Sequence, residues 1–210
     1  MDGTLVDSLM IWEVFWVKIG EKYLGKKDFV PSEEIDKSVR TMTLRDAIEL
    51  IRERYSIRES GDEILEFVNE MLRSFYSETV LLKDGVREFL ENCRKNGVKM
   101  CIASATAPDL VELALKHCEI KDYFLKLFSC GAIGVGKEKP DVFLLAQESL
   151  GSDIEDTWVF EDSLVAIETA KKAGFKTVGI YDRYNYGADR IKEIADEYIA
   201  PGETLMRLFD

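Results

Sequence analysis

Acidic and basic side chains follow several short apolar segments of this chain, where they could bind a metal ion and a phosphate group. Glu161 and Asp162 come directly after the apolar segment 157–160. Two adjacent carboxylates at the end of a buried strand are costly unless a cation balances them, and Mg²⁺ prefers a few carboxylate oxygens completed by water and substrate phosphate. The alternative interpretation is a surface acid followed by a helix cap.

Two further positions favour phosphate binding. Ser104 follows the apolar segment 98–103 and precedes a helix-start pattern at 106–109. Its hydroxyl could donate a hydrogen bond to a phosphate, and the helix N-terminus favours an anion, although serine is also common in ordinary turns. Lys137 lies in the glycine-containing segment 131–141. It could hold a phosphoryl oxygen as a point charge, or be a solvated lysine.

The elements that must position these residues follow two periodicities. From about residue 8 to 79 the apolar spacing is helical throughout and predicts a small helical bundle. From about residue 82 onward, helices alternate with short apolar segments that predict strands at 98–103, 125–130, 157–160 and 176–180, with an edge strand at 197–200. This alternation predicts a parallel, doubly wound α/β sheet, in which ligands bind beyond the carboxyl ends of the strands.

Four motifs occur in order along the chain. They are D-G-T-L-V-D-S from Asp2, a serine at a strand end (Ser104), G-K-x-x-P-D-x-F at 136–143 and V-F-E-D-S-x-x-A-I at 159–167. Together they resemble the four motifs of the haloacid dehalogenase-like (HAD) phosphohydrolases, over essentially the whole chain. The match is to subfamily I with a helical cap, which includes β-phosphoglucomutase-like and phosphoglycolate phosphatase-like enzymes. One departure is Glu138, where that subfamily often has proline.

The resemblance implies a fold and a domain organisation. It implies a doubly wound, Rossmann-like α/β core formed by residues 1–7 and 80–210, with residues 8–79 inserted as a helical cap. The cap arginines Arg40 and Arg45 are expected to be solvated, and the alternative is that one of them binds a substrate carboxylate or phosphate.

The resemblance also implies a role for each site residue. Asp2 would be the general acid/base, and its backbone carbonyl would contact Mg²⁺. Ser104 and the Ala105 N–H would hold the phosphoryl group, and Lys137 would neutralise charge there. Glu161 and Asp162 would hold Mg²⁺ directly or through water. Thr4 would steady the first loop.

The family's nucleophilic aspartate would stand directly before Met1, at the end of a central first strand. We therefore expect the core to lack this strand, and the numbered chain to be inactive. Without the strand, its neighbours would lie roughly 10 Å apart. We expect Met1 to be an internal methionine of a longer protein. The alternatives are a degenerate member that binds phosphate ligands without turnover and a replacement nucleophile.

Composition limits the partners. The net charge of -12 argues against nucleic acid and acidic membrane surfaces. The apolar segment 9–19 carries Glu13 and Lys18, so no membrane span is expected. The four cysteines form no C-x-x-C pair and are expected to be reduced packing residues. A cytoplasmic location is expected, and dimerisation through the sheet gap or the cap stays open.

The sequence thus predicts an Mg²⁺-dependent phosphomonoesterase acting on a small phosphorylated metabolite. A sugar-phosphate mutase of the β-phosphoglucomutase type would share the same core, so the sequence leaves it as an alternative. A non-catalytic phosphate-binding or interaction module is the second alternative. A generic nucleotide-binding α/β domain is disfavoured, because no G-x-G-x-x-G follows a first strand.

Overall fold

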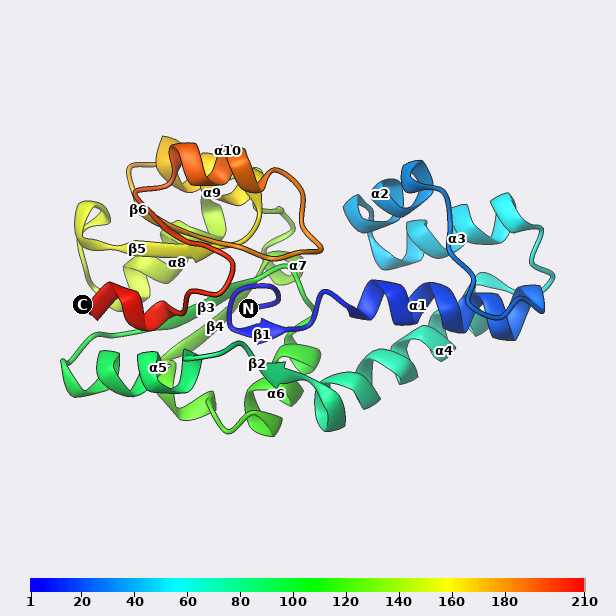
Figure 1. The fold of residues 1–210 in the computed structure, drawn as a ribbon, viewed down its shortest axis with the longest axis horizontal. Helices are drawn as coiled ribbons and strands as arrows, with labels where there is room; N and C mark the ends of the chain where they lie inside the picture. The colour runs from blue at the N-terminus through cyan, green and yellow to red at the C-terminus, as the bar shows by residue number, and fades with distance from the viewer. Residues whose placement is uncertain (210) are drawn as a thin grey trace. The chain divides into compact units, whose positions relative to one another are not determined.

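The computed structural model describes residues 1–209, apart from the side chain of Thr41. The chain forms two compact units (Figure 1). The core unit consists of residues 1–9 and the segment from Tyr76 onward, and the helical unit consists of residues 10–75. In the described residues, no helix is both long and apolar enough to cross a membrane.

The helical unit folds around the apolar faces of four helices. These are α1 (Ile11–Ile19), α2 (Glu33–Thr41), α3 (Leu44–Tyr55) and α4 (Gly61–Ser74), with a π-helical turn at Gly20–Leu24. Apolar residues at helical spacing form one buried cluster: Phe15, Trp16, Ile19, Val39, Ala47, Ile48, Ile51, Ile57, Ile64 and Val68. Ser32, Thr43 and Ser60 cap the starts of α2, α3 and α4 with their side chains.

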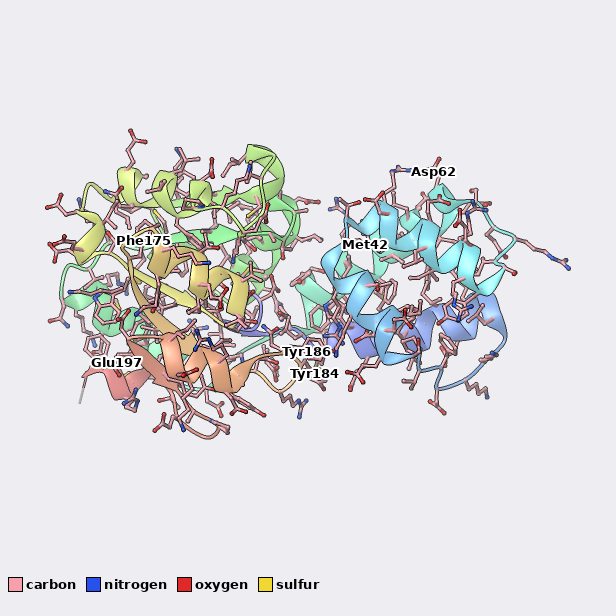
Figure 2. The ribbon with its side chains drawn as sticks, turned by 90° about the horizontal axis from the view of Figure 1, so that it is seen from above. Met42, Asp62, Phe175, Tyr184, Tyr186 and Glu197 are labelled. Atoms are coloured by element: carbon pink, nitrogen blue, oxygen red, sulfur yellow. The ribbon has the colours of Figure 1, made fainter. Side chains whose placement is uncertain are left out.

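The two cap arginines differ in environment. Arg45 is exposed and pairs with Asp62 at 2.8 Å, and Figure 2 shows Asp62 on the outside of the helical unit. Arg40 is only 17% exposed, pairs with Asp36 at 2.8 Å and lies over the ring of Trp12. The expectation of a solvated Arg40 was therefore wrong, because an acidic residue one helical turn earlier and an aromatic face both attract it.

The core unit contains two separate parallel sheets and a short antiparallel pair. In the first sheet, β3 (Cys101–Ser104) pairs with β4 (Lys126–Ser129). In the second, β6 (Lys176–Ile180) lies between β5 (Trp158–Glu161) and β7 (Glu197–Ile199). The antiparallel pair joins β1 (Val6–Asp7) to β2 (Leu81–Leu82). The sequence analysis did not predict this pair, since two-residue strands leave no period to detect.

Helices connect the parallel strands and cover them. They are α5 (Val86–Lys95), α6 (Pro108–His117), α7 (Cys130–Ile133), α8 (Asp141–Leu150), α9 (Leu164–Lys172) and α10 (Ala188–Ile194). In Figure 1, α5 and α6 lie on one side of the strands, and α9 and α10 on the other. Phe175, labelled in Figure 2, belongs to a buried cluster with Val142, Phe143 and Ala166. The result is an α/β, Rossmann-like core, as predicted.

One strand is shorter than predicted. The segment 98–103 was expected to be extended throughout, but β3 begins only at Cys101, and Val98 is 51% exposed. Within the described residues, β3 pairs only with β4, and β5 pairs only with β6. A cavity of about 850 Å³ lies between them, lined by residues of both strands. Val98 also lines this cavity.

The N-cap of α4 provides a test of the helical unit. Ser60 forms a complete capping box with Glu63, whereas the Ser32 cap of α2 accepts a single bond of 3.4 Å. We expect Ser60→Ala to lower the free energy of unfolding of this unit by about 1 kcal/mol. Ser32→Ala should cost clearly less. Urea denaturation followed by circular dichroism measures both, and an equal loss in the two variants would contradict the capping-box account.

Candidate active site

Asp2 is held by three hydroxyl groups at the start of the core unit. Ser8 and Tyr76 donate to Asp2 Oδ1 at 2.6 and 2.8 Å, and Thr106 donates to Oδ2 at 2.7 Å. Burial and the neighbouring Asp2 carboxylate raise the pKa of Tyr76, so its phenol stays protonated and remains a donor. Three donors from three segments fix the orientation of this carboxylate.

Asp162 follows β5 and is bound to the first loop. Thr4 donates to Asp162 Oδ1 at 3.0 Å, and the Asn185 amide donates to Oδ2 at 2.7 Å and to the Asp162 carbonyl at 2.8 Å. Gly3 has a φ of +64°, and a Cβ at this position would lie 2.3 Å from Asp162 Oδ2. The loop therefore needs glycine both for its conformation and for its close approach to the carboxylate.

Lys137 and Glu161 form a buried ion pair beside Asp162. Their side chains are 16% and 5% exposed. Burial lowers the pKa of Lys137, but Glu161 and Asp162 raise it by more, so the ammonium group stays charged. Burial, followed by repulsion from Glu161, raises the pKa of Asp162 to about 6. The loop lysine is thus an ion-paired residue at the strand ends rather than a solvated one.

The charges in this cluster do not balance. When ionised, Asp2, Glu161 and Asp162 carry three negative charges against one positive charge on Lys137, which leaves two uncompensated. Burial and Lys137 lower the pKa of the Met1 amino group beside this cluster. A divalent cation would supply the missing charge.

The donor chemistry of the cluster fits Mg²⁺. Asp162 accepts two side-chain hydrogen bonds, whereas a carboxylate has about four lone-pair sites. Glu161 adds a second carboxylate next to it. Among the described residues, no group of three or more His, Cys, Asp or Glu side chains is arranged to hold a metal. Mg²⁺ usually takes one or two protein carboxylates, with water and substrate oxygens completing its shell, so Asp162 and Glu161 would be its protein ligands.

Ser104 is the last residue of β3, and Ala105 follows it at the carboxyl end of the strand. The buried Ser104 Oγ accepts a hydrogen bond of 3.1 Å from the Thr106 N–H, and α6 begins four residues after Ser104 at Pro108. This turn presents a hydroxyl and the start of a helix. Because Thr106 also binds Asp2, the turn and the first loop are directly joined.

Four residues that position the carboxylates were missed by sequence reasoning. They are Ser8, Tyr76, Thr106 and Asn185. Ser8 belongs to the quoted first motif and Thr106 to the predicted helix start, so both could have been found. Tyr76 and Asn185 lie in segments without a strand period, and only the fold brings them close. Asn185 lies in the loop after β6, and Figure 2 shows Tyr184 and Tyr186 projecting from the same loop.

A second buried ion pair borders the same strand ends. Lys83 donates to Asp182 Oδ2 at 2.7 Å and to the Tyr181 carbonyl at 3.1 Å. Asp182 also accepts the Tyr184 N–H at 2.9 Å. Since Asp182 has a cation of its own, its environment differs from that of Asp162.

Comparison with known proteins identifies the family. Residues 1–174 match the family of haloacid dehalogenase-like hydrolases. This chain belongs to that family. It is 27% identical over 206 residues to a phosphorylated carbohydrates phosphatase from Thermotoga maritima, covering 98% of this chain and 94% of that protein. It is 28% identical over 188 residues to hexitol phosphatase B of Escherichia coli K12, covering 85% and 79%.

Solved HAD structures share the fold. The crystal structure of a putative beta-phosphoglucomutase from Thermotoga maritima superposes with a TM-score of 0.83 at 27% identity, over 100% of this chain and 95% of that one. The recognition of subfamily I with a helical cap is thereby confirmed, and the chain is a HAD-like hydrolase.

The raised pKa of Asp162 predicts a stabilising substitution. The folded state binds the Asp162 proton more tightly than the unfolded state, since the pKa rises from 3.8 to about 6. Ionised Asp162 therefore costs stability above about pH 6, and this cost disappears below about pH 4. We expect Asp162→Asn to raise the free energy of unfolding by roughly 1–2 kcal/mol near neutral pH, with a smaller gain as the pH falls.

Asp182→Asn is the matched control for this measurement. It removes the partner of Lys83, so it should destabilise the core by about 2 kcal/mol or more. Urea denaturation at several pH values compares the two variants. If Asp162→Asn instead lowers the free energy of unfolding at neutral pH, the negative charge of Asp162 is already compensated in the folded protein.

Gly3 provides a second test. Gly3→Ala combines a positive φ with a collision against Asp162, whereas Gly97→Ala at φ +71° meets nothing within 4 Å. We expect Gly97→Ala to lower the free energy of unfolding by about 1 kcal/mol. Gly3→Ala should lower it by more, about 2 kcal/mol or above. Thermal unfolding measures both, and equal losses would contradict the close packing of the first loop on Asp162.

Proposed function

We propose that this protein is an Mg²⁺-dependent phosphomonoesterase that acts on a small phosphorylated metabolite. The observation that supports this most directly is the clustering of Asp2, Lys137, Glu161 and Asp162 at the carboxyl ends of the strands, with two uncompensated negative charges. Such a cluster suits a cation together with a phosphate, whose charges it could balance.

The roles follow from position. Asp2, held in one orientation by three hydroxyl donors, would transfer a proton to the leaving oxygen and later take one from water. Lys137 would place its ammonium charge against a phosphoryl oxygen. Ser104 and Ala105 would bind other phosphoryl oxygens at the start of α6. Asp162 and Glu161 would hold Mg²⁺, which supplies charge neutralisation of the phosphoryl group when bound.

The resemblance to the family places an aspartate directly before Met1, at the end of a strand. The Met1 amino group is buried and close to Asp2, Lys137, Glu161 and Asp162. A carboxylate attached there would reach the same cluster.

The relatives support a class of substrate. Two of them carry the names phosphorylated carbohydrates phosphatase and hexitol phosphatase B, so we propose a phosphorylated sugar or sugar alcohol as the substrate. The similarity to the Thermotoga beta-phosphoglucomutase structure makes a sugar-phosphate mutase the second candidate. A mutase would return the phosphoryl group to a sugar, whereas a phosphatase would release it to water.

Phosphate release tests the proposal. A chain carrying an apolar strand that ends in aspartate ahead of Met1 is given sugar phosphates, hexitol phosphates and phosphoglycolate with Mg²⁺. We expect phosphate release from at least one substrate, and a loss of roughly 10²–10⁴-fold in kcat for Asp2→Asn. Lys137→Met should lose activity as well, because the phosphoryl charge is no longer neutralised.

Exposed residues serve as matched controls. Asp122→Asn and Lys121→Met remove the same charges from the surface and should leave kcat unchanged. Isomerisation of a sugar phosphate without phosphate release would support the mutase instead. Absence of any turnover in the extended chain, with Mg²⁺ and phosphate still bound, would favour a non-catalytic phosphate-binding module.

A further inference from the structure

The Lys83–Asp182 ion pair has no role in the proposed reaction, although it is buried beside the same strand ends. The side chain of Asp182 is 2% exposed and that of Lys83 is 20% exposed. Lys83 donates to Asp182 Oδ2 at 2.7 Å. A buried ion pair is often no more stabilising than an apolar replacement, so stability alone does not account for this one.

Asp182 fixes the conformation of the loop between β6 and α10. Its Oδ1 accepts the Tyr184 N–H at 2.9 Å, and its carbonyl accepts the Asn185 N–H at 3.2 Å. The carboxylate thus holds a turn of the main chain, while Lys83 holds the carboxylate from the other side. Asn185 lies at the end of this turn, between Tyr184 and Tyr186, which Figure 2 labels.

The side-chain amide of Asn185 bridges the side chain and the main chain of Asp162. Its Nδ2 donates to Asp162 Oδ2 at 2.7 Å and to the Asp162 carbonyl at 2.8 Å. Both N–H bonds of this amide are thereby used, and its Oδ1 accepts the Tyr186 N–H at 2.9 Å. Because one amide binds both groups, the Asp162 carboxylate cannot rotate about its χ1 angle without losing a hydrogen bond.

The far end of this loop is fixed by packing. Gly187 has a φ of +84°, and a Cβ at this position would lie 3.0 Å from Leu164 Cδ2. Leu164 is the first residue of α9 and follows Asp162 closely in the sequence. The loop is therefore anchored on both sides of Asn185, by the ion pair before it and by contact with α9 after it.

These contacts form a closed ring with the first loop. Thr4 donates to Asp162 Oδ1 at 3.0 Å, and the Lys83 N–H donates to the Leu5 carbonyl at 2.9 Å. The first loop is thus joined to Asp162 directly and to Asp182 through Lys83. Both oxygens of the Asp162 carboxylate therefore accept a hydrogen bond from a donor that the ring holds in place.

We propose that the Lys83–Asp182 ion pair is a positioning element for Asp162, acting through the side-chain amide of Asn185. The proposal rests on the proposed function, in which Asp162 holds Mg²⁺. Hydrogen-bond partners of metal ligands orient those ligands, and their removal typically weakens metal binding by about 10–100-fold. The ion pair therefore acts on the geometry of the metal site, beyond any contribution to stability.

The Mg²⁺ affinity of the full 210-residue chain, measured by isothermal titration calorimetry, tests this proposal. We expect Asn185→Ala to weaken Mg²⁺ binding roughly tenfold or more. Asp182→Ala should weaken it roughly threefold or more, because the turn that presents Asn185 is released. Asn96→Ala is the matched control. Its amide donates to the Asn92 carbonyl at 2.9 Å at the exposed end of α5, so Mg²⁺ affinity should stay unchanged.

The double variant separates an effect through Asn185 from a general loosening of the core. Asp182→Ala in an Asn185→Ala background should cause no further loss of Mg²⁺ affinity, since the amide that Asp182 positions is gone. Its effect on the free energy of unfolding, measured by urea denaturation, should persist in that background. If Asp182→Ala does not fold, Lys83→Gln replaces it with the same pattern expected, because it keeps a donor and removes the charge.

Three results would overturn the proposal. One is an unchanged or tighter Mg²⁺ affinity in Asn185→Ala. Another is a pair of affinity losses that multiply in the double variant, which would mean that the ion pair acts independently of Asn185. The third is absence of Mg²⁺ binding to the unaltered chain, which would contradict the proposed metal site itself, whereas the first two results leave that site intact.

Discussion

The structure depends on placing two buried carboxylates, Glu161 and Asp162, side by side at the end of β5. An ionised carboxylate in an apolar interior is strongly unfavourable unless it is paired or hydrogen-bonded. Lys137 pairs with Glu161, while Thr4 and Asn185 donate to Asp162. These three donors come from three separate segments. The loops that carry Thr4, Lys137 and Asn185 are therefore held in place by their contacts with the two carboxylates at the end of β5.

The same constraint explains why the site remains unbalanced. The hydrogen bonds orient Asp162 without supplying a charge, and its pKa stays raised to about 6. For stability alone, two adjacent buried acids are unfavourable, whereas the proposed binding of a cation and a phosphate would use both. Membership of the haloacid dehalogenase-like hydrolases and similarity to carbohydrate phosphatases agree with this interpretation.

Much of the core could be predicted from the sequence. The strand at 176–180 was predicted with the bounds of β6, because it is a buried apolar segment with clear glycine and loop boundaries. Asp2, Lys137, Glu161 and Asp162 were placed at strand ends by motif order. Tyr76 and Asn185 could not be found in this way, since their roles arise from contacts over sequence separations of 74 and 23 residues. The later start of β3, at Cys101 rather than Val98, could not be read from the apolar spacing of the segment 98–103.

The central claim is that Asp162 and Glu161 form the protein part of an Mg²⁺ site. Isothermal titration calorimetry with Mg²⁺ near neutral pH tests it most directly, on the chain as it stands and on Asp162→Asn. The account predicts saturable binding of one ion and a loss of roughly tenfold or more in affinity when Asp162 is replaced. Equal affinities in the two proteins, or no binding to the unaltered chain, would contradict it.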